Sequence, residues 1–112
     1  MNMFDEAQSS IQPFLDMSGY QPKTTFWSDF SIADAFGMSA IKDTYNRAFN
    51  GWKNNAEYIT ELTLILNWKI WYWKDKNEAL ARLYDSLWRE TDQWCMDNLT
   101  GDDLQYYLQT TD

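Results

Sequence analysis

The stretch from residue 56 to residue 74, AEYITELTLILNWKIWYWK, constrains the fold most, because its helical wheel is apolar almost all round. At 100° per residue, one narrow sector holds a first apolar stripe. This stripe consists of Ile59, Leu62, Leu66, Ile70 and Trp73. A second stripe, Leu64, Trp68 and Trp71, lies on nearly the opposite side, with Tyr72 on its flank. The pattern predicts either a central helix that other helices surround, or a second face that contacts a partner.

The second stripe is the leading candidate for a functional surface. Trp and Tyr are the residues most enriched at interface hot spots. We therefore expect a protein-contact surface made of Leu64, Trp68, Trp71 and Tyr72. Its partner would be another protein or a second copy of this chain, so the leading hypothesis is a non-enzymatic interaction module with an accessory or regulatory role.

Capping residues predict four further helices around this segment. The expected helices are residues 29–36 after Ser28, 40–53 after Ser39, 78–98 after Asn77 and 101–109 after Thr100. Asn55 is the expected cap of the 56–74 helix, and Gly37 is expected to end the first one. Short connections and the lack of a strand pattern predict an all-α fold, a compact bundle of three to four main helices over residues 26–112. We expect residues 1–25 to form a less regular N-terminal arm, since Pro13 interrupts its apolar pattern.

Length and cysteine content indicate a single reduced domain. A chain of 112 residues can bury enough surface to fold without a disulfide or a metal. Its sole cysteine, Cys95, cannot form an internal disulfide and is expected as an inert core thiol. The N-terminus MNMFDEAQ has no apolar signal sequence, and no apolar run is long enough to span a bilayer. We therefore expect a cytoplasmic protein with no membrane association.

The residue types present argue against an enzyme. The chain has no histidine, which excludes Ser-His and Cys-His nucleophile pairs and any histidine-ligated metal. Glu57 and Glu61 are one helical turn apart, and we expect them to be surface charges. We expect no catalytic residue, no metal site and no cofactor.

The net charge of −8 argues against nucleic-acid partners and is unevenly placed. Residues 1–41, 42–89 and 90–112 carry −4, +2 and −6 respectively. One alternative function is therefore an acidic inhibitor that mimics DNA through residues 90–112. Its charge density is low beside B-DNA, which carries about one charge per 1.7 Å of axis.

A short motif favours a second alternative, a DNA-binding regulator. Residues 32–39, IADAFGMS, resemble the first helix and turn of a helix-turn-helix unit. That resemblance implies DNA contacts from Lys42, Asn46 and Arg47 in the following helix. Asp43 stands where the family places an apolar residue, and the acidic net charge opposes DNA binding.

Taken over residues 25–112, the chain resembles small, functionally uncharacterised acidic helical proteins that bacterial mobile elements or prophages encode. The stretches TTFWSDFSIADAFG and DTYNRAFNGWK carry this resemblance. It implies a mobile-element origin and an all-helical fold, and it assigns no functional residue.

Overall fold

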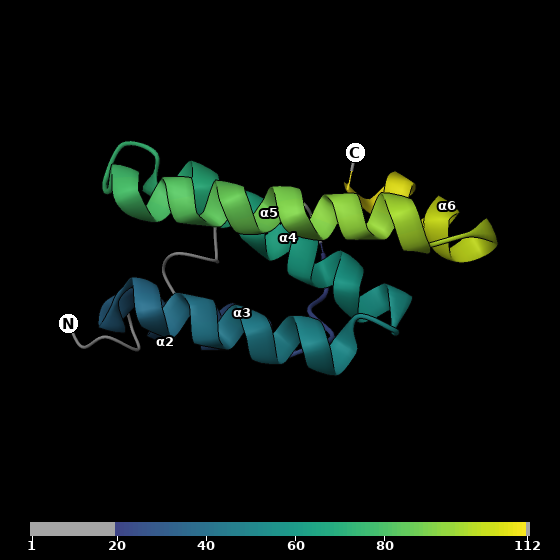
Figure 1. The fold of residues 1–112 in the computed structure, drawn as a ribbon, viewed down its shortest axis with the longest axis horizontal. Helices are drawn as coiled ribbons and strands as arrows, with labels where there is room; N and C mark the ends of the chain where they lie inside the picture. The colour runs from purple at the N-terminus through teal and green to yellow at the C-terminus, as the bar shows by residue number, and fades with distance from the viewer. Residues whose placement is uncertain (1–19, 112) are drawn as a thin grey trace.

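Residues 20–111 are the part of the chain that the computed structural model describes, and they form five α-helices (Figure 1). The helices are α2 (Phe26–Phe36), α3 (Met38–Trp52), α4 (Ala56–Trp73), α5 (Glu78–Asn98) and α6 (Gly101–Thr111). These residues contain no strand, so the predicted all-α fold is confirmed, whereas the predicted count of three to four helices is too low. Residues 1–19, most of the predicted arm, lie outside the described part.

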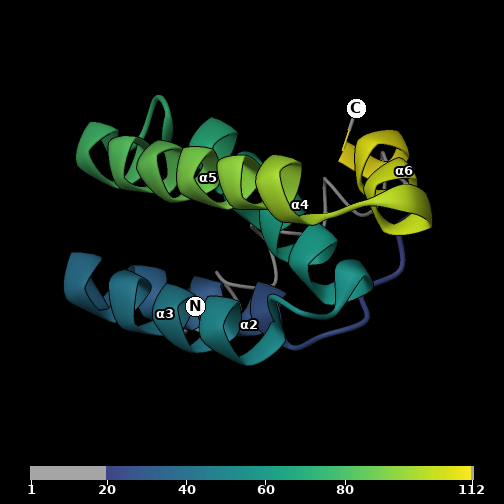
Figure 2. The ribbon, with the colours of Figure 1, turned by 45° about the vertical axis from the view of Figure 1, so that its right-hand side comes forward.

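The helices are arranged around α4. Helices α2 and α3 lie side by side as an antiparallel pair, and α5 runs along the opposite side of the molecule (Figures 1 and 2). Helix α4 passes between this pair and α5, and α6 folds back from the end of α5 onto α4. Because α4 contacts each of the other four described helices, its side chains are covered in most directions, as an almost entirely apolar helix requires.

The two long helices begin at the asparagines that the sequence predicts. The Asn55 side chain accepts a hydrogen bond from the Tyr58 amide at 3.2 Å, and α4 starts at Ala56. The Asn77 side chain accepts one from the Leu80 amide, also at 3.2 Å, and α5 starts at Glu78. Each cap satisfies one of the first amides of its helix, which have no partner within the helix.

The predicted starts of α2 and α3 are wrong by two or three residues. Helix α2 starts at Phe26 rather than after Ser28, because Phe26 and Trp27 are buried and their burial extends the helix towards the N-terminus. Gly37 does end α2, with φ of +104°. The same glycine directly precedes α3, so Ser39 lies inside that helix and does not cap it.

Aromatic side chains fill much of the core between the α2–α3 pair and α5. Phe30 packs edge-on against Tyr84 with ring centroids 6.1 Å apart, and Tyr45 stacks on Phe49 at 5.6 Å. Tyr45 also shares a buried hydrogen bond of 2.9 Å with Thr91. Cys95 is fully buried as predicted, and burial raises its pKa from 9.0 to about 12. Among the described helices, none is both long and apolar enough to cross a membrane.

Candidate functional site

Helix α4 buries four polar side chains. In the sequence, these residues lie between the apolar stripes of the helix. Thr60, Glu61, Thr63 and Lys69 are all at most 1% exposed. The expectation that Glu61 is a surface charge is therefore wrong, although Glu57, one turn earlier, is exposed. A buried charge is strongly destabilising unless it is paired, so Lys69 and Glu61 each require a specific partner.

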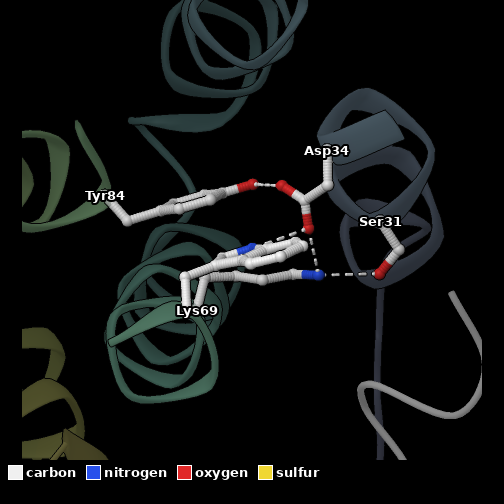
Figure 3. A network of polar contacts seen from close by, with 5 residues as sticks. Ser31, Asp34, Lys69 and Tyr84 are labelled. Atoms are coloured by element: carbon white, nitrogen blue, oxygen red, sulfur yellow. Dashed lines mark hydrogen bonds and ion pairs between the residues drawn. The ribbon is translucent and has the colours of Figure 1, made fainter. Parts of the chain in front are cut away.

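Lys69 belongs to a network that joins α2, α4 and α5 (Figure 3). Its ammonium group donates to Asp34 Oδ2 at 2.7 Å and to Ser31 Oγ at 2.9 Å. Asp34 also accepts from Trp73 Nε1 at 3.2 Å and, through Oδ1, from the Tyr84 hydroxyl. One carboxylate of α2 therefore receives three donors from α4 and α5.

The electrostatics of this network follow from its burial. Removal from water lowers the pKa of Lys69, and the Asp34 carboxylate opposes that shift by favouring the ammonium form. Burial, together with the same carboxylate, raises the pKa of Tyr84 well above 10.0, so its hydroxyl stays protonated and donates. In this network the ammonium of Lys69 is paired with the carboxylate of Asp34, and the Tyr84 hydroxyl donates a hydrogen bond to the same carboxylate.

A serine beside a lysine also occurs in hydrolases, where the lysine takes the proton of the serine hydroxyl. Here Lys69 is fully buried and faces a carboxylate, and Ser31 is only 5% exposed. A substrate could reach neither group without separation of α2 from α4. The arrangement is thus suited to holding helices together and not to reacting with a ligand.

Glu61 holds the segment that leads into α2. Its Oε1 accepts from the Tyr20 hydroxyl at 2.9 Å and from the Lys23 amide at 2.6 Å, and its Oε2 accepts from the Thr24 hydroxyl. The Lys23 side chain continues to α6, where it donates to the Tyr106 hydroxyl at 3.3 Å. Residues 20–24 are therefore fixed across α4 and α6.

The four residues of the surface predicted from the second stripe of α4 differ in their exposure to solvent. Trp71 is 61% exposed, whereas Leu64, Trp68 and Tyr72 are half-buried. Trp68 packs against the core, and the Tyr72 ring lies edge-on against Trp73 at 4.9 Å. The Lys74 ammonium lies 4.8 Å from the centre of the Trp71 ring, a cation–π distance. Of these four side chains, only Trp71 thus presents a large aromatic area to solvent.

Trp71 borders a shallow groove of about 270 Å³ between the end of α4 and the start of α5. The groove is lined by Ile70, Trp71, Lys74, Ala81, Arg82 and Asp85. Arg82 on its rim is already paired with Glu78, at 2.6 Å. One exposed aromatic ring beside charged side chains makes this a small contact area.

A larger groove of about 510 Å³ lies between α2 and α3, and the sequence patterns above did not predict it. It is lined by Thr25, Phe26, Asp29, Ile32, Ala33, Phe36, Ala40, Asp43, Thr44, Arg47, Ala48 and Trp52. Three of these are large apolar side chains with substantial exposure: Phe36 at 69%, Trp52 at 45% and Ile32 at 37%. The spacing of Ile32 and Phe36, one helical turn apart on the outer side of α2, was the available sequence signal.

The groove combines small and large side chains. Ala33, Ala40, Thr44 and Ala48 are buried or half-buried and leave space between the two helices. The larger Phe36 and Trp52 side chains belong to the last residues of α2 and α3. We call this surface, from Thr25 to Trp52, the α2–α3 groove.

The residues of the DNA-binding alternative all lie on α3. Lys42, Asn46 and Arg47 are exposed, and Arg47 lines the α2–α3 groove, where its guanidinium lies 3.5 Å from the Thr44 hydroxyl. Helices α2 and α3 are joined by Gly37 alone. Helix-turn-helix units have a turn of three to four residues, so this connection departs from that pattern.

The acids of residues 90–111 face several directions. Glu90 and Asp97 share one side of α5, whereas Asp92 lies on nearly the opposite side and accepts from Tyr107 of α6. Asp102 and Asp103 lie in the first turn of α6, where a helix favours negative charge. Within residues 20–111, no three potential metal-ligating side chains are grouped closely enough to hold a metal ion.

No protein-family model, curated protein sequence or solved structure matches this chain. The functional interpretation therefore depends on the geometry of the surfaces described above.

Proposed function

We propose that this protein is a non-enzymatic interaction module that binds another polypeptide through the α2–α3 groove. The observation that carries the proposal is the exposure of Ile32, Phe36 and Trp52 along one groove with a floor of small residues. Small soluble proteins rarely expose several large apolar side chains together unless the patch binds something. A mobile-element origin stays a hypothesis beside this proposal.

The groove has the character of a peptide-binding surface. Apolar side chains at its ends and small residues along its floor suit an amphipathic helix, which would place its own apolar side chains between α2 and α3. The Trp52 ring is held edge-on against Tyr58 with centroids 4.7 Å apart. A pre-positioned aromatic side chain loses little conformational freedom on binding, which favours affinity.

Helix α4 supplies the second candidate surface, the originally predicted face of Leu64, Trp68, Trp71 and Tyr72. Its support is the 61% exposure of Trp71. The other three side chains are partly covered within their own chain, so this face offers less area than the α2–α3 groove.

Affinity capture from the source organism with matched variants tests the proposal. Wild-type protein and Trp71→Ser should retain the same bound polypeptide, whereas Phe36→Asp should lose it. Phe36 and Trp71 are the two most exposed of these aromatic side chains, so neither change should disturb the core. Retention by Phe36→Asp together with loss by Trp71→Ser would move the contact surface to α4.

The two nucleic-acid alternatives are tested by direct binding. A DNA-binding regulator should bind duplex DNA at low salt and lose binding with Arg47→Ala. An acidic DNA mimic should compete with DNA for a DNA-binding protein, and it should lose that activity when Asp102 and Asp103 are neutralised. The acids of residues 90–111 lie on several sides of α5 and α6. The DNA-mimic hypothesis therefore has less support than binding through the α2–α3 groove.

A further inference from the structure

The face that contains the α2–α3 groove is complementary to itself. We propose that the groove is occupied by a second copy of this chain, related by a two-fold axis, so that the protein is a homodimer. This inference rests on the proposed function, because it names the partner of the same groove. A two-fold interface requires one surface to carry both halves of every complementary contact.

The shape of the α2–α3 groove is complementary to itself. The groove has projecting side chains, Phe36 and Trp52, and an unfilled floor over Ala33, Ala40 and Ala48. In a two-fold contact, the projecting rings of each copy fill the space above the small residues of the other. The same surface therefore supplies both the projecting rings and the space that receives them.

The charges in the groove are also complementary across a two-fold axis. The groove contains two acids, Asp29 and Asp43, and one base, Arg47, all exposed. A two-fold axis can bring Arg47 of each copy to an acid of the other copy, which gives two equivalent opposite-charge contacts. A partner with a single sign of charge would meet repulsion at one of these positions.

The charge on the rest of the chain also favours contact between two copies at the α2–α3 groove. Residues 90–112 carry −6, so two copies that met through α5 and α6 would repel each other. The α2–α3 groove, with its two acids and one base, has a net charge of −1. Two copies of this acidic protein therefore repel each other less at the α2–α3 groove than at residues 90–112.

The resulting arrangement is an ordinary one for helices. Helix α3 has fifteen residues and is about 22 Å long at 1.5 Å per residue. Packing the α2–α3 pair of one copy on that of another gives a four-helix arrangement with a shared apolar seam.

Sedimentation equilibrium and light scattering of the full chain test the dimer from about 1 µM to about 1 mM, the range of weak to moderate association. We expect a concentration-dependent dimer. Phe36→Asp and Ile32→Asp should weaken it at least about tenfold, and Trp71→Ser should leave it unchanged. Circular dichroism of each variant checks that the helices remain. Because Phe36 is 69% exposed, Phe36→Ser provides a second, milder groove variant.

A mixing experiment tests the two-fold axis. Arg47→Asp and the double change Asp29→Lys with Asp43→Lys should each be monomeric, since each leaves one sign of charge in the groove. An equimolar mixture should form the heterodimer, because the opposite charges are then restored at both contacts. A mixture that stays monomeric while the wild type dimerises would overturn this pairing.

Failure of the dimer and failure of the proposed function are distinguishable. A wild type that is monomeric across the whole range, or a dimer broken by Trp71→Ser and unaffected by Phe36→Asp, overturns the homodimer. A monomer that captures a different protein through Phe36 overturns the homodimer while the proposed function stands. A monomer whose captured proteins are indifferent to Phe36 overturns both.

Discussion

Substitution of Asp34 should destabilise the protein more than substitution of Lys69, its ion-pair partner. Asp34→Ala removes the one carboxylate that receives Lys69, Trp73 and Tyr84. It leaves a fully buried ammonium group without its counter-charge and takes the acceptor from the Tyr84 hydroxyl. Removing one partner of a buried ion pair costs about 3–5 kcal/mol of unfolding free energy. That is a large part of the roughly 5–15 kcal/mol that holds a domain of this kind.

Lys69→Met has a smaller expected effect. The carboxylate of Asp34 then keeps the donors from Trp73 and Tyr84, and the methionine fills much of the volume that the lysine chain occupied. We expect a loss of about 1.5–3 kcal/mol, the range for a hydrogen bond to a charged group. The double variant should be more stable than Asp34→Ala alone, because it no longer contains an uncompensated buried charge.

Urea unfolding followed by circular dichroism gives the three free energies and their coupling. Arg82→Ala is the matched control, because it breaks an ion pair of similar length, 2.6 Å, whose side chains are 79% and 73% exposed. Its unfolding midpoint should not change measurably. The reasoning is refuted if Asp34→Ala loses less than about 1 kcal/mol, or if the effects of the two single changes simply add.

Three further predictions follow from the described contacts. Glu61→Gln should speed hydrogen exchange at the Lys23 amide and tryptic cleavage after Lys23, whereas Glu57→Gln, an exposed control, should not. Since the pKa of Cys95 is raised from 9.0 to about 12, stability should fall as pH rises from 9 towards 12, by at most about 1.4 kcal/mol per pH unit. Cys95→Ala should remove that part of the slope in alkaline urea titrations, and an unchanged slope would contradict the assignment. Asn77→Ala should lower the unfolding free energy by about 1 kcal/mol through loss of the α5 cap, and thermal melts would show no shift if the cap is unimportant.

Local patterns in the sequence were sufficient to predict the all-α fold and the starts of its two longest helices. Asn55 and Asn77 act through amides three residues ahead, so the sequence alone contains both partners of each contact. Ser28 and Ser39 satisfy the same local rule, but the helix starts predicted from them are wrong. There the burial of Phe26 and Trp27, and the use of Gly37 by two helices, outweigh the preference of serine for caps.

The candidate surfaces were harder to predict, because periodicity reports which residues share a face and not what covers that face. Trp68 and Trp71 share one stripe of α4, yet Trp68 packs on the core and Trp71 is 61% exposed. The α2–α3 groove depends on two helices that lie side by side, with a lining drawn from both. The spacing of Ile32 and Phe36 marks an apolar side of α2, but the groove appears only when α3 lies beside it.

The buried charges explain why α4 tolerates an apolar surface on nearly every side without losing a defined position. A uniformly apolar helix can rotate or slide among similar packings, since each offers comparable contact area. Lys69 must meet Asp34, which is 35 residues earlier, and Glu61 must meet the Tyr20–Thr24 segment, which is about 40 residues earlier. Rotation of α4 would leave either charge buried and unpaired, at several kcal/mol. These two pairs therefore select one orientation of α4, and they hold in place the α2 helix on which the proposed interface is built.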